Sequence, residues 1–229
     1  MQAKYETPEW HPAFEEYCEA IYELSEDQVD VIQARIAERL RVTRPAVSEM
    51  VRRMEGEGLV AVAGGAVNLT SRGSHLAEQV VRRHRLAERF LTDVLGLPSS
   101  GAHREAGKWE HVISDEVEAA LVRVLGDPTT CPHGNPIPGT RYKAAPTKAL
   151  SALPVGARFT VARIPEELEF TPGLLEFLEK ASIAPGARGA VTAVSPDGTI
   201  TVEMGHERVG VGAFAADRIL AIEGAAHGA

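Results

Sequence analysis

Residues 103–111 read His103-Arg-Glu-Ala-Gly-Lys-Trp-Glu-His111, and the run Val-Ile-Ser-Asp-Glu-Val-Glu follows directly. The spacing predicts a helix that turns near Ser114. On such a helix His103, Gly107, Glu110 and His111 lie along one face, because residues three and four apart are neighbours. Two imidazoles and a carboxylate on one face form half of a coordination sphere for a divalent metal. The alternative is a solvated helix face, where His and Glu are common.

Two further helical runs carry pairs of hard ligands. His84 and Glu88 are four residues apart in one run, and Glu16 and Glu19 are three apart in another. Acidic pairs are frequent in any soluble chain, so the Glu16/Glu19 pair is weak evidence by itself. The two histidine-bearing helices are the informative ones.

Length and composition bound the class of protein. The chain has 229 residues, which suits one large domain or two to three small ones, and 44% of them are hydrophobic. No apolar run is long enough to span a bilayer and no secretory signal is evident. Cys18 and Cys131 are far apart and lack a CxxC partner, which argues against a disulfide framework or a thiolate zinc site. We therefore expect a cytoplasmic protein without a membrane partner.

The charge is distributed unevenly. The whole chain carries −8, but residues 31–90 contain eleven Arg, no Lys, six Glu and no Asp, which gives this segment +5. A basic segment within an acidic protein is suited to local contact with phosphates, and its acidic remainder disfavours non-specific binding.

The N-terminal pattern predicts a winged helix-turn-helix. We expect residues 1–12 to form a flexible or lightly packed arm and helices to lie over 12–24, 31–40 and 44–57. Thr43 is the expected N-cap of the third helix, with Pro45 in its first turn and Gly58 at its end. A hairpin over residues 59–70 with the turn Gly64-Gly65 forms the wing.

The third helix is the expected DNA-reading element, and double-stranded DNA is the expected partner. Its start is poor in side chains that bind base edges bidentately, so Pro45 and Ala46 are assigned to thymine methyl groups and Arg44 to the groove. We expect specificity to rest substantially on DNA shape and deformability. The candidate DNA-binding residues are Arg39, Thr43, Arg44, Pro45, Ala46, Ser48, Glu49 and Arg53.

The remainder predicts a helical layer followed by a small barrel. A long helix is expected from Ser71 to about Leu95, then helices over 102–113 and 115–125, and a turn-rich linker over 126–155. Short strands are expected over 158–164, 188–194, 200–204 and 207–212, with the hairpin turn Ser195-Pro-Asp-Gly198, and the tail from Gly224 is expected to be disordered. The apolar positions of the helical layer have more surface than one neighbour can cover: Val112, Ile113, Val117, Ala120, Leu121 and Val124.

Three motifs carry a resemblance to a known family. The runs His84-Arg-Leu-Ala-Glu-Arg, Trp109-Glu-His-Val-Ile-Ser-Asp-Glu-Val-Glu and Cys131-Pro-His-Gly-Asn-Pro-Ile-Pro are similar to the diphtheria toxin repressor family, in one register over about residues 13–139. The resemblance implies a mainly α protein with a small β part that represses metal-uptake genes as a homodimer on a palindromic operator. It implies a winged helix-turn-helix domain (1–73), a helical dimerisation and metal-binding domain (74–140), a linker (141–155) and an SH3-like, FeoA-like barrel (156–223).

The resemblance also implies metal ligands, residue by residue. Glu110 and His111 match the Glu-His pair of the family's primary site. Glu16 stands where the iron-responsive branch has methionine, and Glu16 with Glu19 matches the acidic pair of the manganese-responsive branch in kind. Gly107 departs from both branches, so at most its backbone carbonyl ligates. A set of carboxylates and imidazole without sulfur suits Mn²⁺ and tolerates Fe²⁺.

An ancillary site is implied at His84, Glu88 and His103. The family's barrel adds ligands there, and none of the nearby candidates Glu167, Glu169 and Glu176 aligns with them. Two further residues, Glu105 and His133, are interpreted as structural or solvated, His133 because it lies in the linker turn.

Two other functions compete with the metal-dependent repressor. The first is a winged-helix regulator whose metal sites are structural or degenerate and which responds to another effector. The second is a metallohydrolase, which lacks an HExxH-type motif and leaves the basic segment unexplained. We therefore expect neither enzymatic activity nor a small organic substrate, and metal-dependent DNA binding separates the two regulators.

Overall fold

The computed structural model describes residues 12–224, and these form two compact units that meet in sequence between Arg83 and His84. Residues 1–11 of the expected arm and residues 225–229 of the expected tail lie outside the described range. Within residues 12–224 no helix combines the length and the apolar character that crossing a membrane requires.

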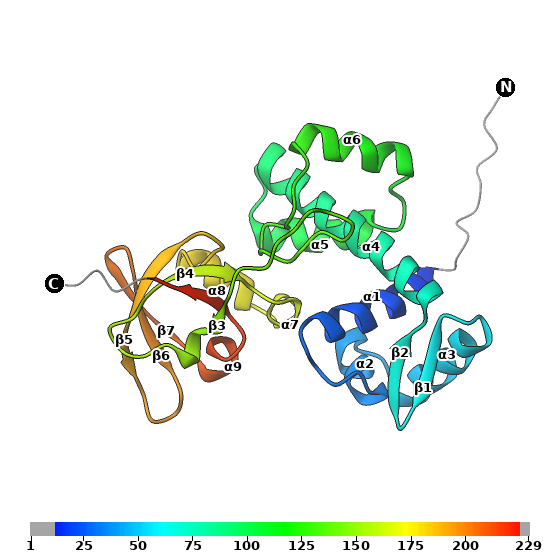
Figure 1. Ribbon diagram of the computed structural model, residues 1–229, viewed down its shortest axis with the longest axis horizontal. Coiled ribbons are helices and arrows are strands. Elements are labelled where there is room, and N and C mark those ends of the chain that lie inside the picture. Colours follow the sequence, from blue (N-terminus) through cyan, green and yellow to red (C-terminus); the bar gives the residue numbers. More distant parts are fainter. Residues whose placement is uncertain (1–11, 225–229) are drawn as a thin grey trace. The chain divides into compact units, whose positions relative to one another are not determined.

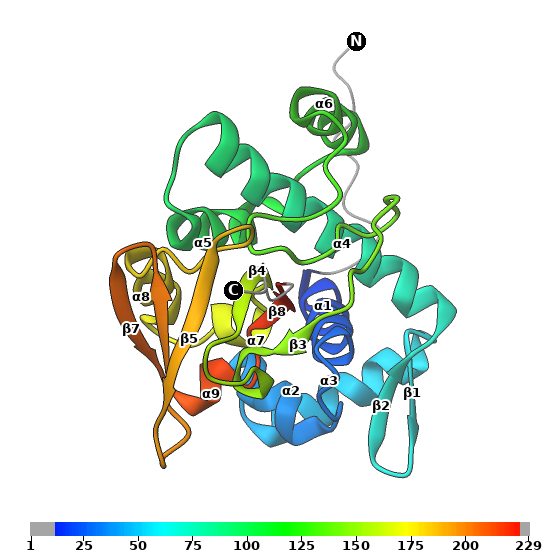
Figure 2. The same ribbon diagram turned by 60° about the vertical axis from the view of Figure 1, so that its left-hand side comes forward.

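The first unit has the expected winged helix-turn-helix order. It contains α1 (Pro12–Glu26), α2 (Gln33–Leu40), α3 (Arg44–Gly56), β1 (Val60–Ala63), β2 (Ala66–Leu69) and the first part of α4 (Ser71–Arg89) (Figure 1). The N–H of Ala46 donates to Thr43 Oγ1 at 3.4 Å, so Thr43 caps α3 as predicted. The wing pairs Val62 with Val67 in antiparallel register, and its tip extends as a hairpin in both views (Figure 2).

A small apolar core holds the first unit together. The backbone of α4 comes directly onto the wing, because a Cβ on Gly73 would lie 2.0 Å from the carbonyl oxygen of Leu59. Only glycine permits that approach. The residues of this core that are 2% exposed or less are Cys18, Ile21, Ile36, Val47, Val51, Met54, Leu59, Val67 and Ala77.

In the second unit the helical layer differs from the sequence prediction at the end of α4 and at both ends of α5, which begins three residues early at Ser99. Helix α4 gives way to a π-helical turn, η1 (Phe90–Val94), and α5 (Ser99–Trp109) ends four residues earlier than expected. The amides of Val112 and Ile113 both bond to the carbonyl of Trp109, which closes a turn before α6 (Asp115–Leu125). The Ser114 hydroxyl caps α6 by accepting from the N–H of Val117 at 3.3 Å.

The C-terminal part of the second unit is a six-stranded sheet with the order β3-β8-β4-β5-β6-β7. All neighbouring strands in it are antiparallel. Its strands are β3 (Lys148–Ala149), β4 (Arg158–Arg163), β5 (Arg188–Val194), β6 (Ile200–Met204), β7 (Glu207–Val211) and β8 (Leu220–Glu223). Between them lie η2 (Leu150–Ala152), α7 (Glu166–Glu169), α8 (Leu174–Lys180) and α9 (Ala213–Ala216).

Two of these strands were not expected. Strand β8 closes the sheet between β3 and β4, and β3 falls inside the segment that the sequence predicts to be linker. Its two residues pair with Ala221 and Leu220 of β8, so the barrel begins eight residues before its predicted start. The expected turn is present, with the Gly198 amide bonded to the Ser195 carbonyl at 2.9 Å.

Candidate metal centre

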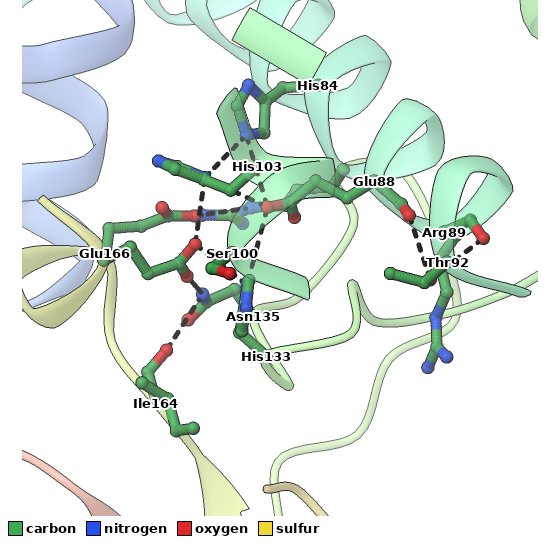
Figure 3. Close-up of polar contacts among 12 residues, drawn as sticks. His84, Glu88, Arg89, Thr92, Ser100, His103, His133, Asn135, Ile164 and Glu166 are labelled. Carbon is green, nitrogen blue, oxygen red and sulfur yellow. Dashed lines mark hydrogen bonds and ion pairs between the residues drawn. The ribbon is translucent and has the colours of Figure 1, made fainter. Parts of the chain in front are cut away.

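Five ionisable side chains meet in the interior of the second unit. They are His84 and Glu88 from α4, His103 from α5, His133 from the turn after α6, and Glu169 from α7, and we call them the central cluster. Figure 3 labels the first four of them. All are buried except His103, whose side chain is 11% exposed. The four-residue spacing on α4 puts His84 and Glu88 on one inward face. Buried charges require compensation, so the cluster needs a chemical explanation.

One oxygen of Glu88 is the meeting point of three imidazoles. Glu88 Oε1 lies 3.0 Å from His103 Nδ1, 3.4 Å from His133 Nδ1 and 3.5 Å from His84 Nε2. Three imidazole nitrogens thus surround a single carboxylate oxygen within 3.5 Å.

Glu169 brings the barrel into the same group. Its Oε2 lies 2.8 Å from His133 Nδ1 and 3.0 Å from His103 Nδ1. The contacts of His133 are close but are not aligned as hydrogen bonds, and Glu88 Oε2 is also buried without a hydrogen bond among the described residues. Nitrogen and oxygen atoms that lie close together, and whose lone pairs accept no hydrogen bond from one another, match the ligand set of a cation.

The other predicted barrel ligands lie elsewhere. Glu167 forms an ion pair with Arg218 at 2.6 Å, and Glu176 forms an exposed pair with Arg104 at 3.0 Å. Glu166, which the sequence did not single out, is fully buried and pairs with the equally buried Arg85 at 3.0 Å.

A second group begins on the other face of His84. His84 Nδ1 lies 2.5 Å from Glu110 Oε2, and His111 Nε2 lies 3.2 Å from Glu110 Oε1. The predicted helix face of residues 103–111 is therefore divided, because α5 ends at Trp109. His103 joins the central cluster, whereas Glu110 contacts His84 and His111 contacts Glu110. Gly107 has open space where a side chain would be, with nothing within 4 Å of its Cβ position.

The first-helix residues of the predicted primary site lie in the first unit. Glu16 is exposed on α1 and Glu19 is half-buried. The set Glu16, Glu19, Glu110 and His111 stays a prediction.

Several combinations of donors are close enough to hold an ion. Within each of three sets in the second unit, one ligand atom per residue lies within 4.8 Å of the others. The sets are His84 with Glu88 and His103; Glu88 with Cys131 and His133; and His103 with Glu166 and Glu169.

The charges of the central cluster stabilise one another. Burial lowers the pKa of His103, but Glu169 and Glu88 outweigh it and raise that pKa to about 10. In the same way His84 and His133 have pKa values well above 6.5. Burial raises the pKa of Glu169, yet the nearby imidazoles bring it to about 2. Protons on the rings thus balance the carboxylates, and a divalent cation would have to displace them.

His133 lies inside the protein. The sequence interpretation allowed a structural or a solvated residue, and the solvated alternative is wrong because His133 is buried against Glu88 and Glu169. The signal that could have revealed it is the pair Cys131 and His133, two metal-ligand residue types two residues apart in a turn beside a barrel. Glu105 remains on the surface, paired with Lys108 at 2.6 Å.

The predicted DNA-reading residues on α3 and at its cap are exposed or half-buried, and Arg39 on α2 is the exception. The exposed residues are Thr43, Arg44, Pro45, Ala46, Glu49 and Arg53, and Ser48 is half-buried. Arg39 differs, because its side chain is 6% exposed and forms an ion pair with the buried Glu23. That pair joins α2 to α1, and the role of Arg39 in DNA binding stays a prediction. The Arg53 guanidinium lies over the ring of Phe14, 5.4 Å from its centroid.

Known proteins match the chain along most of its length. Residues 11–65 match the iron dependent repressor N-terminal DNA binding domain, residues 70–139 the iron dependent repressor metal binding and dimerisation domain, and residues 148–222 the FeoA domain. The iron-dependent repressor IdeR of Mycobacterium tuberculosis (strain ATCC 25618 / H37Rv) is 43% identical over 207 residues, which is 85% of this chain and 90% of the relative. The diphtheria toxin repressor of Corynebacterium diphtheriae is 54% identical over 126 residues, 55% of this chain and 56% of the relative.

A solved structure agrees over nearly the whole chain. It is described as a manganese-dependent transcriptional repressor in complex with manganese, and its TM-score is 0.82 at 34% identity. The similarity covers 92% of this chain and 99% of that one.

Proposed function

Since the chain belongs to the iron-dependent repressor family, we propose that it is a transcriptional repressor that binds operator DNA as a homodimer when Mn²⁺ or Fe²⁺ is bound. The observation that carries the metal dependence is the convergence of three imidazoles on Glu88 beside Glu169. Repression of metal-uptake genes is the proposed role.

Two metal sites are proposed. The first is the set Glu16, Glu19, Glu110 and His111, supported by the contact between Glu110 and His111 and by the absence of sulfur. The second lies in the central cluster and takes its ligands from His84, Glu88, His103, His133 and Glu169. These residues would hold a cation between α4, α5 and α7, and the cation would supply the positive charge that the imidazoles otherwise supply by protonation.

The donor types favour hard to intermediate ions. Carboxylate and imidazole suit Mn²⁺ and Fe²⁺, whereas a thiolate would select softer ones. Cys131 is close enough to add a sulfur, but burial and the charge of Glu88 raise the pKa of its thiol to about 12. We therefore expect oxygen and nitrogen atoms, and not the sulfur, to ligate the ion, and metal supply in the cell to decide between manganese and iron.

DNA binding is assigned to α3 and dimerisation to α6 and the turn before it. The exposed start of α3 offers Arg44 to the groove, with Pro45 and Ala46 for thymine methyl groups. Val112, Val117 and Val124 are 75%, 47% and 62% exposed, an apolar surface that a second copy would cover. A twofold dimer matches a palindromic operator.

The test selects DNA from a random pool with Mn²⁺ and with chelator, and then measures the affinity of the selected duplex by fluorescence anisotropy. The proposal requires binding that appears with Mn²⁺ or with Fe²⁺ under anaerobic conditions and is lost in the variant His111→Ala. Equal affinity with chelator would favour a regulator whose metal sites are structural or which responds to another effector.

A further inference from the structure

The turn from Cys131 to Ile137 is fixed against the barrel by its backbone. The Cys131 amide bonds to the Asn135 carbonyl at 2.9 Å, and the amide of Ile164, just after β4, donates to the His133 carbonyl at 2.8 Å. Gly134 has φ +85°, and a Cβ there would lie 2.3 Å from the carbonyl oxygen of Ala162. The turn therefore has one register on the barrel, which determines where the side chains at 133 and 135 lie.

Asn135 is fully buried at this contact, and its neighbours define how its amide is oriented (Figure 3). Its Oδ1 accepts from Arg163 Nε, a group that can only donate, so the amide nitrogen must face the other way. There Nδ2 donates to the Ile164 carbonyl at 3.1 Å and to Glu169 Oε1 at 2.7 Å. Both amide protons and the amide oxygen are thus used.

The bond to Glu169 determines which carboxylate oxygen enters the central cluster. Asn135 holds Oε1, while Oε2 lies within 3.0 Å of both His103 Nδ1 and His133 Nδ1. Helix α7 has a single turn and is held on its other side by the pair of Glu167 with Arg218. The two imidazoles contact Oε2, whereas Asn135 holds the opposite oxygen, so its amide sets the rotation of the Glu169 carboxylate from behind the cluster.

We propose that Asn135 is a positioning residue for the second metal site, which holds Glu169 so that Oε2 is the metal ligand and so joins the barrel to the centre. This inference rests on the proposed function, since it assigns a role toward the metal. Partners that orient a ligand from behind typically contribute about 10- to 100-fold to metal affinity. The same amide also bonds to Ile164, so it couples the ligand to the end of β4.

The test measures Mn²⁺ binding to the full chain by electron paramagnetic resonance, which detects the free ion. Asn135→Asp keeps the size and the acceptor for Arg163 but removes both donated bonds, and Asn135→Ala removes the whole amide. We expect affinity at one site to fall about 10- to 100-fold in both variants. The matched control is Ser100→Ala, which removes a different hydrogen bond between α5 and the barrel, from Ser100 Oγ to Glu179 Oε2 at 2.9 Å. It should leave Mn²⁺ affinity unchanged.

A double-mutant cycle separates positioning from a general loss of packing. In a Glu169→Gln background, Asn135→Ala should cost no further affinity, whereas a purely structural role would make the two losses multiply. If either Asn135 variant binds Mn²⁺ like the wild type while Glu169→Gln binds weakly, the positioning role is wrong and the metal site stands. If Glu169→Gln itself binds normally, the second site and this inference are both wrong.

Discussion

Replacing Glu88 by Gln removes the charge on which the three imidazoles converge and changes little in size. Glu88 Oε1 lies 3.0–3.5 Å from His103, His133 and His84, and its side chain is completely buried. Without metal, the variant leaves protonated imidazoles with less compensation. Removing one partner of a buried charge pair costs about 3–5 kcal/mol, and loss of a ring proton can reduce this cost. We therefore expect a clear loss of stability in the second unit.

The response to metal should change as well. A ligand at 100 times its dissociation constant stabilises the folded protein by about 2.7 kcal/mol, which raises the Tm of a domain of this size by about 5–11 °C. Calorimetry with and without Mn²⁺ should show that increase for the wild type and little of it for Glu88→Gln. The matched control is Glu105→Gln on α5, whose carboxylate pairs with Lys108 at the surface, a kind of pair that contributes about 0–1 kcal/mol. A full metal-dependent increase in Glu88→Gln would refute the assignment of Glu88 as a ligand.

Other changes have defined outcomes. Metal affinity should rise with pH, because the ion displaces protons from rings such as His103, whose pKa is about 10, and calorimetry in two buffers should detect their release. Without metal, the contribution of protonated His103 to folding stability is complete below the ordinary histidine pKa of 6.5 and is lost as pH rises through 10. The contribution of ionised Glu169 is complete above pH 4.5 and is lost as pH falls through 2. Thermal unfolding should therefore show greatest stability near pH 4.5–6.5, and a maximum above pH 8 would contradict this. Gly107→Glu, which has open space, should tighten Mn²⁺ binding, whereas Gly107→Ala should only stabilise α5 by about 0.5–1 kcal/mol. Arg53→Ala should lower the salt dependence of DNA binding by about one unit, and Arg39→Ala should instead destabilise the first unit by leaving a buried carboxylate without its partner.

Local signals in the sequence were sufficient for the first unit. The cap at Thr43 and the glycine turn of the wing are set by residues a few positions apart, so they are readable without the fold. The end of α5 at Trp109 could not be predicted in this way, because nothing between Trp109 and Ser114 is a strong helix breaker. The short strand β3 was also missed, because its two residues are defined by pairing with β8 across the barrel.

Only part of the metal centre was predictable. His84 and Glu88 follow from their four-residue spacing on one helix, and His103 follows from the resemblance to a family. His133 and Glu169 join the cluster through the contact between a turn and a barrel that are about 30 residues apart in the chain, and no periodicity reports such a contact. The burial of Arg39 could not be predicted for a similar reason, because its partner Glu23 lies on another helix.

The most direct test of metal-dependent DNA binding is thermodynamic reciprocity between the two ligands. The Mn²⁺ affinity of the full chain is measured by calorimetry with and without the selected duplex, and the duplex affinity is measured with and without Mn²⁺. If metal and DNA favour the same state, the two ratios are equal and greater than one. A Mn²⁺ affinity that DNA does not change, alongside DNA binding that Mn²⁺ does not change, would contradict the account.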